Sequence, residues 1–158
     1  MTVKANVGPD STVSLQEITE QTVVPICKLS DTLSEHQKKM VASNAVSIAQ
    51  AHFNPYAWFR AIYADEIPVG FIMLYDNPEL PKYFLWRFMI ARPYQRLSYG
   101  KKAIQLLLNY VKTRPSAKEL LLSCGEGEEN PEGFYTKLGF KRTGEVIDEE
   151  VVMMLTLA

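Results

Sequence analysis

Hydrophobic and polar positions along the chain follow two different periods, and each segment with a clear period predicts a strand or a helix. Alternation, or a short continuous apolar run, predicts strands. The segments with these patterns are 13–18, 58–63, 69–75, 83–90, 119–124 and 150–157. The second and third are separated by the five residues 64–68, which predicts an antiparallel hairpin. The run at 119–124 is almost entirely apolar, as expected of a buried strand.

Helical spacing or capping residues mark four further segments. The first is a short helix that Thr19 or Thr22 caps and that runs toward Leu29, and the second is a long helix over 35–53 that Ser34 caps. The third covers 101–114 and ends before Pro115. The fourth is a short helix from Asn130-Pro131 to Gly139. The long helix rests on Val41, Ala45 and Ile48, which share one helical face. In the last helix, Asn130 is a favoured N-cap and Gly139 a favoured C′ residue.

The order of these elements is strand, two helices, three strands, helix, strand, helix, strand, with residues 1–11 as a loose end. An antiparallel half is thus followed by a strand–helix–strand–helix–strand half, which predicts an α/β fold with a mixed sheet. The chain has no repeat, low-complexity tract or linker, so a single domain over 1–158 is expected.

Composition excludes several classes of function. Of 158 residues, 47% are hydrophobic, and 17 basic residues nearly balance 18 acidic ones, for a net charge of -1. This balance gives no reason to expect nucleic acid or an anionic membrane as a partner. With no apolar leader or membrane-length apolar run, and with Cys27 and Cys124 best interpreted as reduced thiols, a cytoplasmic protein is expected. His36 and His52 form no ligand cluster, so no metal site is expected.

The stretch YQRLSYGKK, residues 94–102, lies between a predicted strand and a predicted helix. The first N–H groups of a helix have no intrahelical partner and form the positive end of its dipole, so such a turn can bind a phosphate. Lys101 and Lys102 add positive charge. The stretch lacks the glycines and the Lys-Ser/Thr pair of a P-loop, and also the three glycines of a dinucleotide fingerprint. From the turn alone, an ordinary strand-to-helix connection is the favoured interpretation.

Two motifs extend this interpretation. Gln95-Arg96-Leu97-Ser98-Tyr99-Gly100 resembles the acyl-CoA signature of the GNAT N-acetyltransferases, and residues 130–140, NPEGFYTKLGF, resemble the C-terminal segment of that family. The resemblance covers roughly 13–157. The wording at 37–51, 69–73 and 85–90 is similar to the bacterial diamine and polyamine (spermine/spermidine) acetyltransferases. The resemblance implies a GNAT-type fold, with a central mixed, mostly antiparallel sheet flanked by helices, and a homodimer.

The resemblance also implies acetyl-CoA as cofactor and a set of residues that bind it. Those residues are Phe88, Met89 and Ile90 for the pantetheine arm, Gln95, Arg96, Leu97, Ser98, Tyr99, Gly100 and Lys101 for the pyrophosphate, and Asn130 and Lys137 for further contacts. Asn130 can also act as an N-cap, and Lys137 as a solvent-facing lysine. Ser98 replaces a signature glycine. At a positive φ a serine costs on the order of 1 kcal/mol, unless the backbone there never needed glycine.

Amine acetylation requires the removal of a proton from the amine and the supply of one to the leaving thiolate. A primary amine of pKa about 10.4 is mostly charged at pH 7. Forming the neutral, nucleophilic amine at this pH costs roughly 4–5 kcal/mol. Tyr135 aligns with the catalytic tyrosine of the family and is the candidate general acid, although a core aromatic is the alternative. Cys124 as an acyl-enzyme nucleophile is less favoured than a buried, inert thiol.

The general base and the amine-binding residues stay open. Glu126, Glu128 and Glu129, together with Glu132, form an acidic loop that would attract a polycation, but a solvated loop explains them equally well. Weaker candidates are the carboxylates Glu35, Asp65, Glu66 and Glu79 and the aromatic residues Tyr56, Trp58 and Trp86. The expected reaction is acetyl transfer to a primary amine of a small diamine or polyamine. The alternatives are a GNAT acting on an antibiotic amine or a protein N-terminus, and a non-catalytic acyl-CoA-binding module.

Overall fold

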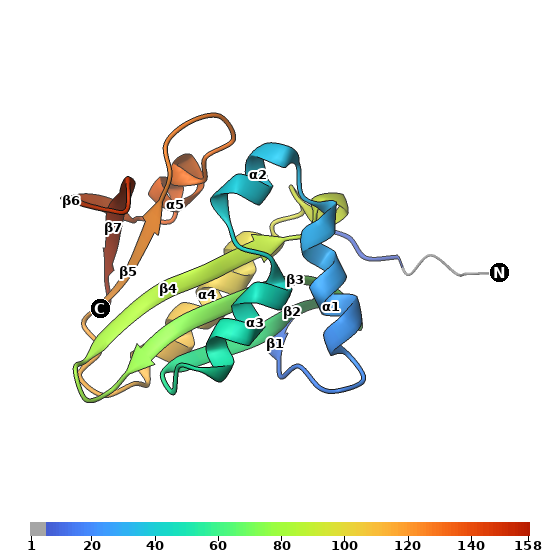
Figure 1. Ribbon diagram of the computed structural model, residues 1–158, viewed down its shortest axis with the longest axis horizontal. Helices are drawn as coiled ribbons and strands as arrows, with labels where there is room; N and C mark the ends of the chain where they lie inside the picture. Colours follow the sequence, from blue (N-terminus) through green and yellow to red (C-terminus); the bar gives the residue numbers. More distant parts are fainter. Residues whose placement is uncertain (1–5) are drawn as a thin grey trace.

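The structure is a computed structural model that describes residues 6–158, so the first five residues of the predicted loose end lie outside it. Seven strands form one sheet in the order β1-β2-β3-β4-β5-β7-β6 (Figure 1). The strands are β1 (Val13–Gln16), β2 (Ala57–Ala64), β3 (Ile67–Asn77), β4 (Lys82–Ile90), β5 (Glu119–Cys124), β6 (Lys141–Ile147) and β7 (Glu150–Thr156). All neighbouring pairs are antiparallel except β4 and β5. This arrangement confirms the mixed, mostly antiparallel sheet and the 58–75 hairpin.

Helices cover the two faces of the sheet (Figure 1). They are α1 (Val23–Leu29), α2 (Glu35–Met40), α3 (Asn44–His52), α4 (Tyr99–Lys112) and α5 (Glu132–Lys137), with short 3-10 turns at Ser30–Thr32 and Arg92–Tyr94. Ile104 and Leu107 of α4 are fully buried in the larger core, which also holds Tyr135 of α5. Ile26 of α1 is buried in a second core on the opposite face, against which Ile48 of α3 packs. The fold is therefore a three-layer arrangement of helices, sheet and helices.

The predicted long helix over 35–53 is wrong, because it consists of two helices. Ser34 caps α2 through a capping box with Gln37, as expected, but α2 ends at Met40 and Val41 is extended. Ser43 then accepts a hydrogen bond from the Val46 N–H and starts α3. Serine side chains that bond to nearby backbone groups compete with helix continuation, and here the competition ends one helix and begins another.

Asn44 explains why the predicted apolar face of this region does not match the buried one. Its side-chain amide donates to the Ile26 carbonyl of α1 at 2.8 Å, and its own N–H donates to Ser30 Oγ at 3.1 Å. Asn44 and Ser47 are buried, whereas Ala45 is exposed. Polar anchoring to α1 thus sets the rotation of α3, and hydrophobic periodicity does not report it.

Strand β6 was not predicted. It lies at the edge of the sheet and every one of its residues is exposed. Gly144 and a register shift between Arg142 and Val146 interrupt the strand. An exposed edge strand has no buried face to impose alternation, so its sequence lacks the pattern that reveals other strands.

The pairing of β4 with β5 is short and leads directly to the site. Only Phe84↔Leu121 and Leu85↔Leu122 are paired, although β4 continues to Ile90 and β5 to Cys124. The two parallel strands therefore diverge toward their C-terminal ends. Within residues 6–158, no helix is both long and apolar enough to cross a membrane.

Gly70 on β3 is required by a close approach of the neighbouring strands. A Cβ at this position would overlap the Met89 backbone oxygen and lie 2.9 Å from Ile90 Cδ1. We expect Gly70→Ala to destabilise the protein by about 1–3 kcal/mol, the usual cost of overpacking, which lowers Tm by roughly 3–10 °C for a chain of this size. Thermal unfolding followed by circular dichroism measures the shift. Gly8→Ala is the matched control, because a Cβ there meets nothing within 4 Å. Equal Tm values for the two variants would contradict the steric argument.

Candidate active site

A cleft of about 1110 Å³ opens where β4 and β5 diverge. Its walls come from α2, the C-terminal half of β4, the turn before α4, the end of β5 and helix α5. The cleft gathers most of the residues expected from the sequence: Phe88, Met89, Ile90, Gln95, Arg96, Ser98, Tyr99, Gly100, Lys101, Glu129, Tyr135 and Lys137. Leu97, Glu126, Glu128 and Asn130 do not line it.

The edge of β4 that faces the cleft presents free backbone groups. The Ala91 N–H donates to the Val69 carbonyl of β3 at 2.8 Å, and in an antiparallel ladder alternate residues face the same neighbour. Met89 is therefore turned toward β3, whereas the N–H and C=O groups of Phe88 and Ile90 are turned toward the cleft. The Ile90 C=O already accepts from Gln95 Nε2, so an extended chain entering the cleft can pair with the remaining groups, the N–H and C=O of Phe88 and the N–H of Ile90, as an added strand would.

Gln95 connects this edge to helix α2. Its Nε2 donates to the Ile90 carbonyl at 2.9 Å, and its Oε1 accepts from Gln37 Nε2 at 3.3 Å. Gln37 Oε1 in turn accepts from the Ser34 N–H at 3.1 Å. The first residue of the signature motif thus acts through its side chain and fixes the turn against both β4 and α2.

The N-terminus of α4 forms the floor of the cleft at the turn. The first intrahelical bond runs from the Lys102 N–H to the Ser98 carbonyl at 3.1 Å. The N–H groups of Tyr99, Gly100 and Lys101 consequently have no partner within the helix, and they carry the positive end of the dipole of a helix of 14 residues. This is the donor arrangement that binds phosphate groups.

The lysines at this turn have different roles. Lys101 is exposed and lines the cleft, as do Arg96 and Lys137. Lys102 points away from the cleft, because its Nζ donates to the carbonyls of Pro9 and Ser11 at 2.7 and 3.3 Å. The expectation that Lys102 adds charge to the anion site is therefore wrong, and this lysine instead ties the N-terminal segment to α4.

Ser98 occupies a left-handed conformation, with φ 67° and ψ 11°. The signature position therefore has the backbone angles that favour glycine, which settles the question that the sequence left open. The hydroxyl of Ser98 makes no side-chain cap bond to α4. Arg96 two residues earlier also has a positive φ, of 65°. Because neither residue is a glycine, both positions in the turn are strained.

We expect Ser98→Gly to stabilise the protein slightly. Relief of the left-handed strain is worth about 1–2 kcal/mol, and the greater freedom of glycine in the unfolded chain offsets about 0.5–1 kcal/mol of it. The net gain of at most about 1.5 kcal/mol corresponds to a Tm rise of at most roughly 5 °C. Ser98→Ala keeps the Cβ and removes only the hydroxyl, so its Tm should not rise. A gain in both variants would assign the effect to the hydroxyl and not to the backbone.

Gly100 permits close packing beneath the turn. A Cβ on Gly100 would lie 3.2 Å from Phe134 Cζ and 3.4 Å from Phe88 Cζ. The rings of Phe88 and Phe134 are stacked with centroids 5.9 Å apart. The second glycine of the signature thus allows the start of α4 to approach the aromatic residues that join β4 to α5.

Tyr135 lies on α5, where the larger core and the cleft meet. It is buried in that core and also lines the cleft. The ring makes edge contacts with Phe134 and Phe140, with centroids 5.2 and 5.7 Å away. Burial, and next the nearby Cys124, raise the pKa of the Tyr135 phenol well above its usual range. In the described part of the chain its hydroxyl has no hydrogen-bond partner. A protonated phenol that faces a cleft and is not already bonded is a suitable proton donor.

Helix α5 is held in place at its C-terminal end by Gly139. The Phe140 N–H donates to the Tyr135 carbonyl at 3.1 Å and the Gly139 N–H donates to the Thr136 carbonyl at 3.0 Å. Together with the positive φ of Gly139, of 103°, these bonds form a Schellman motif. The predicted role of Gly139 is confirmed.

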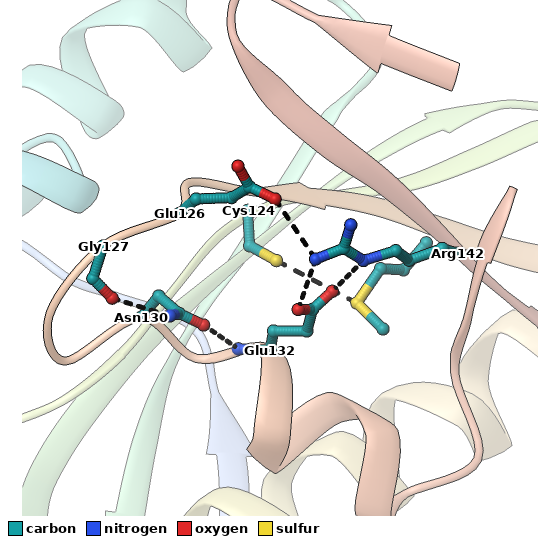
Figure 2. Close-up of polar contacts among 7 residues, drawn as sticks. Cys124, Glu126, Gly127, Asn130, Glu132 and Arg142 are labelled. Carbon is teal, nitrogen blue, oxygen red and sulfur yellow. Dashed lines mark hydrogen bonds and ion pairs between the residues drawn. The ribbon is translucent and has the colours of Figure 1, made fainter. Parts of the chain in front are cut away.

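The acidic loop between β5 and α5 is engaged in ion pairs, as Figure 2 shows. The Arg142 guanidinium of β6 donates to Glu132 at 2.7 Å and to Glu126 at 3.2 Å. Asn130 Nδ2 donates to the Gly127 carbonyl at 2.7 Å, and Asn130 Oδ1 accepts from the Glu132 N–H at 3.0 Å. Pro131, and not Asn130 as predicted, occupies the N-cap position, because the first intrahelical bond runs from the Tyr135 N–H to the Pro131 carbonyl. The Asn130 side chain instead fixes the turn that leads into α5.

The remaining carboxylates of this loop reach across to α2. Glu129 accepts from Ser34 Oγ at 2.5 Å, and Glu128 lies 3.4 Å from His36 Nε2. Of the three glutamates predicted to bind the amine, only Glu129 lines the cleft. The loop and α2 thus enclose one side of the cleft between them.

Two carboxylates of the cleft were missed by the sequence analysis. Asp148 and Glu150 lie in and after the turn between β6 and β7, and both line the cleft. Glu150 is half-buried and accepts a hydrogen bond from Ser123 Oγ of β5 at 3.1 Å. They reach the cleft through the tight turn at Asp148-Glu149, where both residues have a positive φ. The sequence there has no glycine or asparagine of the kind that usually marks such a hairpin turn, so the chain carried no clear signal for it.

Arg87 of β4 lies close to Glu150 and was also missed as a cleft residue. Burial lowers the pKa of its guanidinium, and the charge of Glu150 opposes this shift. Its terminal nitrogens donate to the Gln50 side chain at 2.9 Å and to the Trp86 carbonyl at 3.1 Å. The irregularity between Met73 and Leu74 on β3 faces Trp86 and places both Trp86 and Arg87 at the cleft.

The weaker candidates lie elsewhere, with one exception. Trp86 borders the cleft, but Trp58 stacks on Tyr110 at 4.4 Å, and Tyr56 donates to Glu79 at 3.1 Å. Glu35, Asp65, Glu66 and Glu79 are not part of the cleft wall. Among residues 6–158, no cluster of His, Cys, Asp or Glu that could hold a metal ion is found.

Cys124 borders the cleft but is poorly suited to nucleophilic attack. It is 4% exposed, and burial raises the pKa of its thiol to about 11. Its Sγ lies 3.9 Å from Met153 Sδ (Figure 2). A thiol that stays protonated at neutral pH favours direct transfer over an acyl-enzyme.

Comparisons with known proteins agree with this geometry. The family described as acetyltransferase (GNAT) family matches residues 26–140. An acetyltransferase from Thermus thermophilus has a similar structure, with a TM-score of 0.75 and 14% identity, over 92% of this chain and 97% of that one. The ribosomal-protein-S18-alanine N-acetyltransferase from Escherichia coli gives a TM-score of 0.70 and 13% identity, over 93% and 95%.

A PaiA N-acetyltransferase from Thermoplasma acidophilum, solved in complex with coenzyme A, gives a TM-score of 0.63 and 19% identity, over 92% and 99% of the two chains. No curated protein matches the chain in sequence. At these identities the solved structures establish the shared fold alone. Membership of the family rests on the family match over residues 26–140.

Proposed function

This chain belongs to the acetyltransferase (GNAT) family, and from that premise we propose that it acetylates a primary amine of a small diamine or polyamine. The protein is an acetyl-CoA-dependent N-acetyltransferase with the mixed sheet of this family. The observation that carries the finer proposal is the wall of the cleft opposite the turn, where the carboxylates of Asp148 and Glu150 line the cleft together with the indole of Trp86. Carboxylates and aromatic rings are the groups that attract organic cations.

The residues present fit acetyl-CoA. We propose that the free N–H groups of Tyr99, Gly100 and Lys101 hold its pyrophosphate. The N–H and C=O groups of Phe88 and the N–H of Ile90 are proposed to pair with its pantetheine arm, while the Ile90 C=O stays bonded to Gln95. Two independent sets of unpaired donors line the same cleft, one at a helix N-terminus and one along a strand edge. When bound, acetyl-CoA supplies the acetyl group as an activated thioester.

Tyr135 is proposed to supply the proton that the departing thiolate needs. Its phenol is protonated at neutral pH, because burial raises its pKa. Its ring is held by edge contacts with Phe134 and Phe140, and its backbone by the Schellman turn of α5. A proton donor held in one orientation requires little reorganisation during the reaction.

Glu150 is proposed to accept the proton from the ammonium form of the substrate, directly or through a water molecule. Among the described carboxylates that line the cleft, Glu150 is half-buried, whereas Glu129 and Asp148 are exposed. Its carboxylate is held by Ser123 Oγ at 3.1 Å on β5, the strand that ends in Cys124 next to Tyr135. Ser123 and Cys124 alternate along β5, so the proposed base and acid approach the gap between β4 and β5 from opposite faces of the sheet.

The rival acceptors are an antibiotic amine and a protein N-terminus. The second has a specific point in its favour, because one solved structure of similar fold is described as a ribosomal-protein-S18-alanine N-acetyltransferase. A non-catalytic acyl-CoA-binding module is the remaining alternative that the strained Ser98 raised.

A single assay separates these proposals. Release of free coenzyme A thiol is measured with acetyl-CoA and a panel of diamines, polyamines, aminoglycosides and peptides that begin with alanine. Diamines and polyamines should give the highest kcat/KM. Acceleration by peptides alone would overturn the diamine proposal. Tight coenzyme binding by calorimetry without transfer to any amine would favour the binding module.

A further inference from the structure

A groove of about 400 Å³ runs along the face of the sheet opposite α4. Its floor is formed by Phe84, Leu121, Val152 and Ile147, one residue from each of β4, β5, β7 and β6. The strand register places these side chains on one face, because Phe84 is opposite Leu121 and the partners Ser123 and Val152 follow two residues along. Helices α1 and α3 lie over the β1–β4 half of this face and leave the β5-β7-β6 part open (Figure 1).

The groove is continuous with the cleft. Phe84, Trp86 and Ile147 line both of them. Glu150, the proposed base, lies opposite Ile147 in the β6–β7 pair. A molecule whose amine reaches Glu150 can therefore extend into the groove over the same face of the sheet.

The groove has an apolar floor and a polar far end. Its aliphatic and aromatic side chains are Tyr75, Phe84, Trp86, Leu121, Ile147 and Val152. Asn54 also lines it, and the side-chain oxygens of Asn54 and Tyr75 already accept from the Tyr56 N–H and Asn77 Nδ2. Glu145 on β6 and Lys82 on β4 form its far rim. An ionic group held over the apolar floor would lose hydration without a partner, whereas methylene groups gain from burial there.

Glu145 and Glu150 bound this apolar strip. Glu145 precedes Ile147 by two residues on β6, and Glu150 faces Ile147 from β7. Glu145 lies in the irregular stretch of β6 between Arg142 and Val146, on the groove side of Ile147, whereas Glu150 lies on the cleft side. The strip therefore matches a linear molecule with a cation at each end and no charge in the middle.

We propose that this groove is the binding site for the chain of an α,ω-diamine, which rests on the proposed function above. One amine lies at Glu150 for acetylation, the methylenes cover the apolar floor, and the far ammonium is bound by Glu145. The substrate class is thus a long diamine, in preference to a polyamine with an interior ammonium. The ring of Phe84 along the path is compatible with the passage of a cation, and the Trp86 ring already holds the Arg87 guanidinium 5.5 Å from its centroid.

The test is a series of diaminoalkanes of increasing length, with matched n-alkylamines and spermidine. The kcat/KM should rise about fourfold for each methylene that the groove buries and stop rising once the groove is filled. Leu121→Trp fills the groove and should remove this length dependence. Ile147→Ser, at a residue that is 43% exposed, should weaken it with less risk to folding. Melting curves verify that both variants are folded.

Glu145→Gln tests the far end. It should lower kcat/KM for long diamines by up to about fivefold, as expected for an exposed ion pair, and should leave n-alkylamines unchanged. Glu149→Gln is the matched control, since Glu149 lies in the same hairpin, is exposed and lines neither the cleft nor the groove.

The outcomes separate this inference from the proposed function. Equal kcat/KM for short and long diamines, with no effect of the groove variants, would overturn the groove while acetylation of diamines still stands. Preference for ω-amino acids, whose carboxylate would bind Lys82, would overturn the diamine assignment. Failure of every amine to be acetylated would overturn both.

Discussion

Replacement of Tyr135 by Phe is expected to lower kcat by a factor of about 10²–10⁴, the usual contribution of a positioned general acid. The substitution removes one oxygen atom, and the ring keeps its contacts with Phe134 and Phe140. The hydroxyl has no hydrogen-bond partner within residues 6–158, so its loss leaves no buried group unpaired. The dissociation constant of acetyl-CoA and the Tm should both stay close to those of the parent protein. Steady-state kinetics, calorimetry and thermal unfolding measure the three quantities.

Tyr94→Phe is the matched control for this prediction. Tyr94 is half-buried and borders the same cleft from the 3-10 turn after β4. The substitution removes the same oxygen atom from a phenol. The kcat of the variant should change by no more than about twofold, because Tyr94 lies outside the proposed path of the proton. An undiminished kcat in Tyr135→Phe would exclude the acid role. A fall in Tm alongside kcat would instead indicate that the hydroxyl serves packing.

Glu150→Gln is expected to reduce kcat/KM about a hundredfold at pH 7, within the range for loss of a general base. The amide keeps an oxygen that can accept from Ser123 Oγ, so the β5–β7 contact at 3.1 Å is preserved. The loss should shrink as the pH approaches the amine pKa of about 10.4, because solution then supplies the neutral nucleophile. The ratio of kcat/KM between parent and variant, measured from pH 7 to about pH 10, tests this sign.

Two further variants make the result of Glu150→Gln specific. Ser123→Ala removes the hydroxyl that orients the carboxylate and should give a smaller loss with the same pH trend. Glu149→Gln changes an exposed neighbour and should have no effect. A pH-independent loss in Glu150→Gln would assign this residue to substrate binding, not to proton transfer.

Sequence patterns predicted the fold well wherever a buried face imposed a period. Helix α4 is an example, because Ile104, Leu107, Leu108 and Val111 are all buried as their spacing indicated. The pattern failed where other forces set the structure. Hydrogen bonds from Asn44 rotate α3, and no buried face exists on β6.

The candidate site was predictable only in its local parts. The turn before α4 and the helix carrying Tyr135 are continuous in sequence, and both line the cleft. Glu150 and Asp148 reach the cleft only through the pairing of β6 with β7. Glu126 and Glu128 looked equivalent to Glu129 in the sequence, but Arg142 and His36 engage them outside the cleft wall. Such competition among charges depends on partners that are distant along the chain.

The two-residue junction between β4 and β5 also has a consequence for local unfolding. The β2–β3 and β5–β7 pairs join eight and six residue pairs, whereas β4–β5 joins two. The hydrogen-bond ladder is thus weakest between the strands that border the cleft, and segment 119–156 can act as a separate foldon with its own opening free energy. A ligand bound in the cleft bridges both sides of this junction and stabilises the closed form by mass action. Amide hydrogen exchange in β5 and β7 should therefore report occupancy of the cleft, whereas exchange in β2 and β3 follows global unfolding.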